Sequence, residues 1–169
     1  QMPVTFIPAA ERYYLMGPID RWVVDHALRG VTEARSRGLV QRVGINLSGQ
    51  TLSDTRFADY LERKMEEYAV DPQTLCFELT ETAAITHLTE TAQLMRRLSA
   101  KGVSFALDDF GTGMSSFAYL RKLPVHILKI DGVFLRAAAP DNIDRPLIEA
   151  MARVARELGM KTVAEHVER

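Results

Sequence analysis

The sequence is poor in cysteine, in long apolar runs and in net charge. Its single cysteine, Cys76, cannot form an internal disulfide. No stretch approaches the roughly 20 apolar residues that a membrane span requires, and the opening residues, QMPVTFIPAAER, lack the basic-then-apolar layout of a signal peptide. The formal net charge of −1 offers no field that would attract nucleic acid or an anionic membrane. We therefore expect a cytoplasmic segment without DNA, RNA or membrane contacts, although other segments of a longer protein could anchor it.

The remaining composition is that of a globular domain. Hydrophobic residues make up 47% of the chain and charged residues 25%, which is enough apolar material for a sizeable core. A length of 169 residues suits one domain, so we expect residues 1–169 to form a single unit. Cys76 lies in the strand-like run LCFEL and is expected to be a small buried hydrophobe.

Two patterns alternate along the chain and predict an α/β fold. Apolar residues at three- and four-residue spacing predict helices, and the short apolar runs between them predict strands. This alternation favours a parallel sheet joined by right-handed crossovers. The predicted helices are 18–35, 54–69, 88–100 and 146–158, and the predicted strands are 42–48, 74–81, 103–109, 126–131 and 161–168.

The helices carry their own end signals. Pro18 suits a first helical turn, and Asp54 is a good N-cap. Gly102 and Gly159 are expected to end the helices that precede them. The apolar stripes of the predicted helices should face the core, and they include Trp22, Leu147 and Leu158.

Each predicted strand ends in polar residues that packing does not require. The carboxyl ends of parallel strands lie at one edge of the sheet, and in an α/β barrel that edge holds the active site. Five such ends in succession are hard to attribute to chance. The residues are Asn46, Glu78, Asp108, Asp109, Lys129, Asp131 and Glu165.

The chemistry of this set favours a hard metal ion. Carboxylate and amide oxygens suit Mg²⁺, Mn²⁺ or Ca²⁺, and crowded carboxylates need cations or protons nearby. The adjacent acids Asp108 and Asp109 could serve two ions if one of them bridges. Two ions about 3.5–4 Å apart are a recurring device for phosphoester hydrolysis. Lys129 is costly to bury without a charged partner, and it could position water or neutralise a phosphate.

The same residues also have purely structural interpretations. Asp108 and Asp109, which precede Gly-Thr-Gly, could form a polar turn after a strand. Asn46 could form an Asx turn, and Glu78 could belong to a capping arrangement for the next helix. The glycines of this loop could permit unusual backbone angles and also let the loop move.

Further alternatives concern the remaining acids. Glu81 could take part in a helix cap beside Thr80. Asp131 is equally a helix cap or a support for the site. Glu165 and Glu168 could be solvated residues near the end of the chain.

The motifs INLSGQ, FELTET, DDFGTGMSSFAYL, LKIDGVF and VAEHVER resemble those of the EAL-type cyclic di-GMP phosphodiesterases. The five motifs occur in order over almost the whole chain, and DDFGTG is the most distinctive. The resemblance implies a modified (β/α)₈ TIM-barrel-like fold. It also implies hydrolysis of cyclic di-GMP to linear pGpG with two Mg²⁺ or Mn²⁺ ions, in bacterial second-messenger signalling. The alternative function is a non-catalytic receptor or regulatory domain that binds cyclic di-GMP.

The resemblance further implies roles for single residues. Asn46, Glu78 and Asp108 match ligands of one metal ion, and Asp108 also matches the bridge to a second ion shared with Asp109 and Glu165. Lys129 matches the lysine that orients the nucleophilic water, so Lys129, Glu165 and Asp108 are the expected catalytic residues. Substrate-binding or loop-anchoring roles fall to Glu81, Glu168, Gly111, Thr112, Gly113 and Ser115.

The sequence departs from the family pattern at both ends. The signature Glu-Ala-Leu tripeptide and the final strand are absent, which leaves about five of eight barrel strands. The first and last strands should therefore be open edges, and we expect weak or absent turnover because one metal ligand is missing. A fragment of a longer domain, strands supplied by a second copy, or a truncated non-catalytic relative would each explain this. Flanking sensory or GGDEF-type domains and a homodimer are expected from the family.

Overall fold

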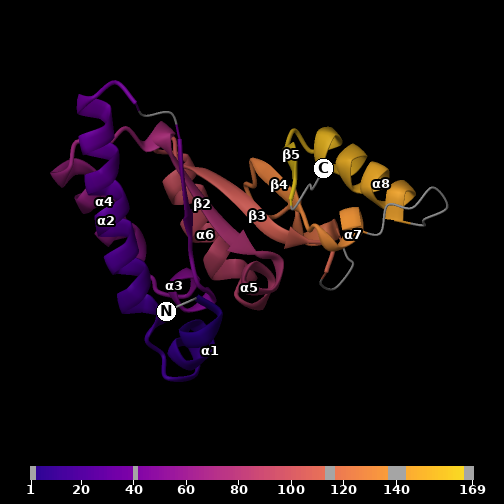
Figure 1. Cartoon of the computed structure of the whole chain (residues 1–169), viewed down its shortest axis with the longest axis horizontal. Coiled ribbons are helices and arrows are strands. Elements are labelled where there is room, and N and C mark those ends of the chain that lie inside the picture. The colour runs from indigo at the N-terminus through magenta and orange to yellow at the C-terminus, as the bar shows by residue number, and fades with distance from the viewer. Residues whose placement is uncertain (1–2, 40–41, 113–116, 137–143, 166–169) are drawn as a thin grey trace.

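The computed structural model describes residues 3–39, 42–112, 117–136 and 144–165. A five-stranded parallel sheet runs through its centre, with the strands side by side in sequence order (Figure 1). The predicted parallel α/β arrangement is confirmed, and the first and last strands are the two edges of the sheet. The strands are β1 (Val43–Asn46), β2 (Leu75–Thr80), β3 (Ser104–Phe110), β4 (Ile127–Ile130) and β5 (Lys161–Ala164).

The four predicted helices are present, with ends that differ by a few residues. One further helix precedes them, and shorter helices and two 3₁₀ turns lie between them in the described residues. The sequence pattern made no prediction for any of these. Figure 1 places α2 and α4 toward one end of the long axis and α8 toward the other. The helices are α1 (Pro3–Arg12), α2 (Met16–Ser36), α3 (Gly49–Leu52), α4 (Phe57–Glu67), α5 (Glu81–Thr86), α6 (Leu88–Ser99), α7 (Val133–Arg136) and α8 (Asp144–Glu157), and the 3₁₀ turns are η1 (Pro72–Thr74) and η2 (Phe117–Tyr119).

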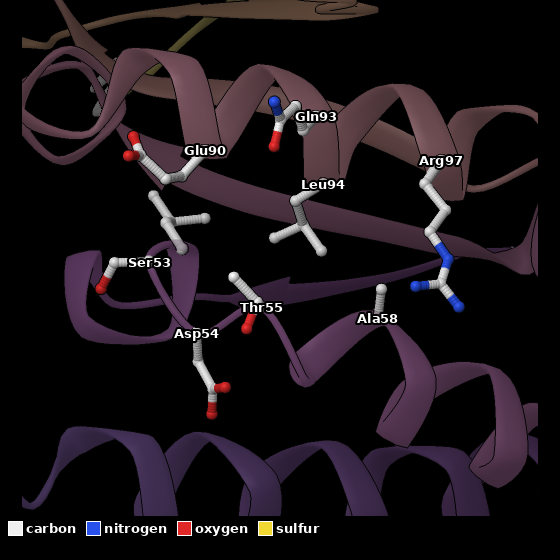
Figure 2. Close-up of a pocket in the computed structure, with 9 residues that line it drawn as sticks. Ser53, Asp54, Thr55, Ala58, Glu90, Gln93, Leu94 and Arg97 are labelled. Atoms are coloured by element: carbon white, nitrogen blue, oxygen red, sulfur yellow. The ribbon is translucent and has the colours of Figure 1, made fainter.

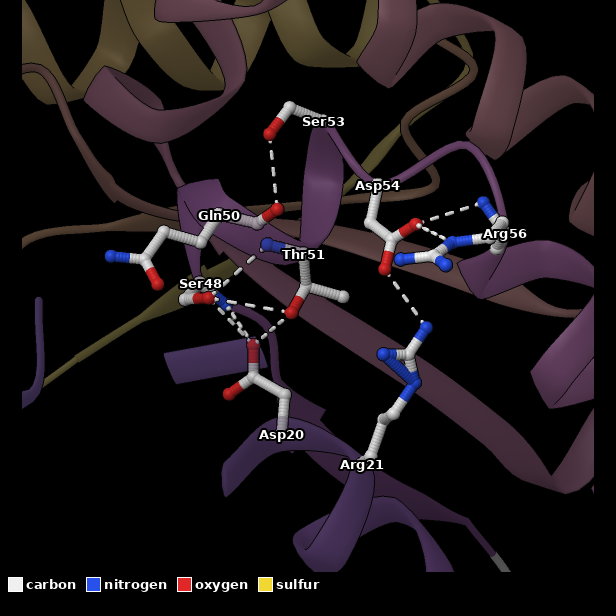
Figure 3. Close-up of polar contacts among 8 residues, drawn as sticks. All are labelled: Asp20, Arg21, Ser48, Gln50, Thr51, Ser53, Asp54 and Arg56. Atoms are coloured by element: carbon white, nitrogen blue, oxygen red, sulfur yellow. Dashed lines mark hydrogen bonds and ion pairs between the residues drawn. The ribbon is translucent and has the colours of Figure 1, made fainter. Parts of the chain in front are cut away.

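Most of the predicted helix-end signals are confirmed. Pro18 lies in the first turn of α2. Gly102 and Gly159 follow α6 and α8 with φ of 104° and 75°, backbone angles that glycine adopts without a Cβ penalty. The prediction of an Asp54 N-cap is wrong, because α4 begins at Phe57 with Arg56 at the N-cap. The Asp54 carboxylate instead accepts the Arg56 N–H and forms an ion pair with Arg21 (Figure 3).

Three apolar side chains that were predicted to be core are exposed. Trp22 has 62% of its surface exposed, because it is two residues from the buried Val24 and therefore lies about 200° around α2 from it. Its ring packs against His26, with ring centroids 3.9 Å apart. Leu147 on α8 and Leu158 directly after it are also exposed. The helix α8 packs against β4 and β5 at the edge of the sheet.

The two faces of the sheet differ in chemistry. Alternate strand residues such as Phe77, Phe105 and Leu128 are fully buried and join the hydrophobic core with the helices. The intervening residues form the opposite face. On β1, β2 and β3 its side chains are small near the start of the strand and polar near the end. Cys76 belongs to this face and is buried, as predicted. No helix in the described part of the chain is both long and apolar enough to cross a membrane.

Candidate metal and active site

Lys129 is the centre of an ionic cluster at the carboxyl ends of the strands. Its ammonium nitrogen lies 2.7 Å from Glu78 Oε2, 2.9 Å from Asp108 Oδ1 and 2.8 Å from Glu165 Oε1. The four side chains come from β2, β3, β4 and the residue after β5. All four are largely shielded, with 16–22% of each side chain exposed. The expectation that Lys129 needs charged partners is therefore confirmed, with three of them in contact.

The cluster shifts the proton affinities of its members. Burial acts to lower the pKa of Lys129, but hydrogen bonds to Glu165, Glu78 and Asp108 together raise it above its usual value. Lys129 is therefore charged at neutral pH. Burial also raises the pKa of Glu165; the hydrogen bond from Lys129 opposes this rise, and the nearby Asp108 adds to it. Glu165 therefore binds a proton more readily than a glutamate in water.

A β-bulge brings two adjacent acids into one site. Between matched positions, β3 advances three residues, from Leu107 to Phe110, while β4 advances two, from Leu128 to Ile130. The additional residue allows neighbouring side chains, which would otherwise alternate between faces, to point the same way. Asp109 takes the left-handed backbone that this requires, with φ of 54°.

The donor set around the bulge fits a divalent cation. Asp108, Asp109 and Glu165 each offer one carboxylate oxygen, and these oxygens lie within 4.8 Å of one another. Carboxylate oxygens at such spacing are the ligands that Mg²⁺, Mn²⁺ and Ca²⁺ prefer. Both acids lie within β3, and Asp109 also opens the turn that follows, because its carbonyl oxygen accepts the Thr112 N–H.

Asn46 lies beside Glu78 on the edge strand β1, as its register partner. Within the described part of the chain its side chain has no hydrogen-bond partner, so the Asx-turn alternative is not formed there. Gly44, two residues earlier, makes room for Glu78, because a Cβ at this position would collide with the Glu78 carboxylate. The sequence pattern gave no hint of this contact.

A buried aspartate on α2 holds the turn that follows Asn46. Asp20 is 4% exposed, and its Oδ2 accepts the Ser48 N–H at 2.9 Å and the hydroxyls of Ser48 and Thr51 at 2.6 Å each (Figure 3). Ser48 is also the N-cap of α3. These bonds tie the end of β1 to α2, and they were not foreseen because Asp20 is 28 residues from Ser48 along the chain.

Glu81 lies beneath the glycine turn that follows the two acids. It is 4% exposed; its Oε2 accepts the Gly111 N–H at 3.1 Å and its Oε1 accepts the Tyr119 hydroxyl at 2.7 Å. Burial raises the pKa of Tyr119, and the hydrogen bond to Glu81 adds to the rise, so the phenol stays protonated as a donor. Thr80, rather than Glu81, caps α5 by accepting the Ala83 N–H. Tyr119 is the partner that the sequence pattern missed.

Gly111 is the glycine of this turn that the structure requires. Its φ is 99°, and a Cβ there would lie 2.8 Å from the Phe134 ring and 3.1 Å from the Met151 sulfur. The neighbouring Thr112 hydroxyl donates to the Asp109 carbonyl. The other loop positions with predicted roles, Gly113 and Ser115, lie outside the described residues, as does Glu168.

Asp131, for which two roles were open, acts as a cap. Its Oδ1 accepts the Val133 N–H at 2.7 Å in the turn that opens α7. Among the described residues, the ion pairs of Lys129 are with Glu78, Asp108 and Glu165 and not with Asp131, so no contact supports the second role.

A separate cavity of about 200 Å³ lies in the helical layer, between α6 and the segment that links α3 to α4 (Figure 2). Glu90 and Gln93 face Ser53 and Thr55 across it. None of the predicted site residues lines this cavity.

Comparison with known proteins decides the family. The EAL domain family model matches residues 1–169. The chain belongs to the EAL family. The resemblance carried by the five motifs is thereby confirmed, and so is the expected fold class.

Proteins similar to this EAL chain carry phosphodiesterase names. It is 39% identical over 166 residues to cyclic di-GMP phosphodiesterase PdeB from Shewanella oneidensis. It is 34% identical over 166 residues to cyclic di-GMP phosphodiesterase PdeF from Escherichia coli K12. Each match covers 98% of this chain but only 19% and 22% of the relatives, so the chain spans about a fifth of their length.

Solved EAL structures share the fold closely. The PaMucR phosphodiesterase in complex with c-di-GMP has a TM-score of 0.91 at 33% identity, and the match covers 99% of this chain and 73% of that one. The EAL domain of Xanthomonas citri FimX in complex with c-di-GMP also has a TM-score of 0.91, at 27% identity, with coverage of 100% and 67%. The sheet of this EAL chain therefore corresponds to part of the TIM-barrel-like fold.

Proposed function

We propose that this EAL chain forms the catalytic part of a phosphodiesterase that hydrolyses cyclic di-GMP to linear pGpG in bacterial second-messenger signalling. The observation that carries the proposal is the cluster of Glu78, Asp108 and Glu165 around Lys129, beside the bulge that adds Asp109. The phosphodiesterase names of PdeB and PdeF support it, as does the PaMucR complex with c-di-GMP.

The charge balance of the cluster supports a role for divalent cations. Three carboxylates contact one ammonium, so two negative charges are left when all four groups are ionised. An anionic phosphodiester would be repelled by such a site without further positive charge. We assign Mg²⁺ or Mn²⁺, two ions, to the oxygens of Asn46, Glu78, Asp108, Asp109 and Glu165. When bound, such ions lower the pKa of water and stabilise charge on the transferring phosphoryl group.

The residues of the chain divide the remaining work. A water oxygen forms a bond to one phosphorus and the P–O3′ ester bond breaks, because the product pGpG carries a 5′-phosphate. The released 3′-oxygen takes up a proton from solvent and becomes a hydroxyl. We assign to the charged Lys129 the orientation of that water or a contact with a phosphate oxygen. To Glu165, whose pKa is raised by burial, we assign acceptance of the proton that the water loses.

The turn after β3 is assigned to substrate binding. Glu81 would anchor it through Gly111, and substrate-binding or loop-anchoring roles are proposed for Gly111, Thr112, Gly113, Ser115 and Glu168. The contacts of Glu81 with Gly111 and Tyr119 support the anchoring role. A homodimer, flanking sensory or GGDEF-type domains and a cytoplasmic location also belong to the proposal. The name of the similar bifunctional diguanylate cyclase/cyclic di-GMP phosphodiesterase MucR supports the flanking GGDEF-type domain.

The function is tested on the protein that carries this segment. It is incubated with cyclic di-GMP and Mg²⁺ or Mn²⁺, and pGpG is followed by chromatography. We expect Asp108→Asn to abolish turnover, because a neutral amide replaces the shared carboxylate. The matched control Asp59→Asn makes the same change on the exposed face of α4 and should leave turnover unchanged.

Three outcomes are informative. The absence of pGpG with the unmodified protein would overturn the proposed activity. Tight binding of cyclic di-GMP without product, measured by calorimetry, would favour the receptor alternative. Full activity of the Asp108→Asn protein would remove Asp108 from the catalytic set, and the role of shared metal ligand would then have to belong to another residue.

A further inference from the structure

The ammonium of Lys129 occupies the position in which a cation would be expected. It contacts three carboxylates at 2.7–2.9 Å, and only 16% of its side chain is exposed. Three acids from separate strands would repel one another without a cation between them. Lys129 therefore holds Glu78, Asp108 and Glu165 together in the chain described here.

Two of these carboxylates are also metal-ligand candidates. Asp108 and Glu165 belong both to the partners of Lys129 and to the oxygen cluster with Asp109. A divalent ion held by that cluster would share ligands with the ammonium and would lie a few ångströms from it. Like charges at that separation repel strongly in a shielded site.

We infer that Lys129 is an internal counter-ion that competes with divalent metal for the shared carboxylates, so that metal binding requires its ammonium to move away from Asp108 and Glu165. The inference rests on the proposed metal-dependent function and adds to it a control on metal occupancy. Lys129 stabilises the site while metal is absent, and it sets a threshold concentration for metal. Once metal is bound, its ammonium is released to contact water or phosphate.

Competition predicts an uncommon combination of effects for Lys129→Met. Methionine keeps most of the length of the side chain but removes the charge. The metal-free protein should be less stable than the unmodified one, because three carboxylates lose their shared partner. Mn²⁺ should bind roughly tenfold more tightly, a factor equivalent to about 1.4 kcal/mol, because no ammonium opposes it. Turnover should nevertheless be lost.

The experiment measures metal binding and stability separately from activity. Mn²⁺ affinity is determined by calorimetry, and urea unfolding is followed by circular dichroism in EDTA and in saturating Mn²⁺. The matched control Lys161→Met removes a lysine of the adjacent strand β5 whose side chain is exposed. We expect the control to behave like the unmodified protein. For Lys129→Met we expect a lower midpoint in EDTA and a larger gain on adding Mn²⁺.

Equal or weaker Mn²⁺ binding by Lys129→Met, with normal binding by the unmodified protein, would overturn the counter-ion role and leave the proposed function intact. No Mn²⁺ binding by either protein would overturn the metal-dependent function, and this inference with it. Should Lys129→Met fail to fold, ¹⁵N NMR of the lysine ammonium groups in the unmodified protein is decisive. The Lys129 signal should shift when Mg²⁺ is added, and an unchanged signal at saturating Mg²⁺ would contradict the competition.

Discussion

The contacts of Glu81 allow its contribution to stability to be worked out. Its carboxylate is 4% exposed and accepts two hydrogen bonds, at 3.1 Å from the Gly111 N–H and at 2.7 Å from the Tyr119 hydroxyl. A hydrogen bond to a charged group contributes about 1.5–3 kcal/mol. We therefore expect Glu81→Ala to lower the free energy of unfolding by about 3–6 kcal/mol, which is a large part of the roughly 5–15 kcal/mol of a typical domain.

Tyr119→Phe removes only one of the two bonds and should cost about 1.5–3 kcal/mol. Both single variants remove this same bond. The double variant should therefore cost less than the sum of the two single variants, by about the energy of that one bond. Urea unfolding followed by far-ultraviolet circular dichroism measures all three free energies. Fluorescence of Trp22 is a poorer probe, because this side chain is 62% exposed in the folded state.

The control for this cycle is Glu66→Ala on the exposed face of α4, which should change stability by no more than about 0.5 kcal/mol. Costs of Glu81→Ala and Tyr119→Phe that add fully would show that the two side chains do not interact. A cost of Glu81→Ala near that of the control would refute the burial and bonding assigned to the carboxylate.

Two further predictions concern the glycine turn after β3 and the buried cysteine. Gly111→Ala should lower the free energy of unfolding by about 2–4 kcal/mol, through left-handed backbone strain and crowding against Phe134. Gly38→Ala, with φ of 70° and no atom near the added Cβ, should cost only about 1–2 kcal/mol; equal costs in urea unfolding would exclude the crowding. Burial raises the pKa of the Cys76 thiol, and Glu78 adds to the rise, so the thiol should react with Ellman's reagent at neutral pH only after unfolding. Labelling of the folded protein as fast as that of the unfolded chain would contradict its burial.

Local sequence patterns were sufficient to predict the main elements. The spacing of apolar residues marked the positions of α2, α4, α6 and α8, and short apolar runs marked all five strands. Such patterns depend on the fixed periods of helix and strand, which are properties of the chain itself. They failed at Asp54, whose carboxylate pairs with Arg21. They also failed at Trp22, whose exposure depends on which face of α2 the rest of the protein covers.

The polar residues at the strand ends were also apparent in the sequence, because parallel strands must present their carboxyl ends at one edge. Their grouping as a cluster around Lys129 was not, since it depends on the register of β2, β3 and β4. The bulge illustrates the limit well. Nothing local to Asp108 and Asp109 shows that β3 gains a residue relative to β4, yet this shift alone brings both acids into one site.

The sequence by itself thus determined which residue types are available at the strand ends. These are side chains with hard oxygen ligands, one lysine, and a glycine turn directly after the two acids. Only the tertiary structure decided which of them meet. It paired Lys129 with three carboxylates, placed Glu81 beneath Gly111 with Tyr119 as a second partner, and bound Asp20 to the end of β1. These contacts join residues 21 to 51 positions apart, and they form because strand register and helix packing bring distant segments together, which no local pattern encodes.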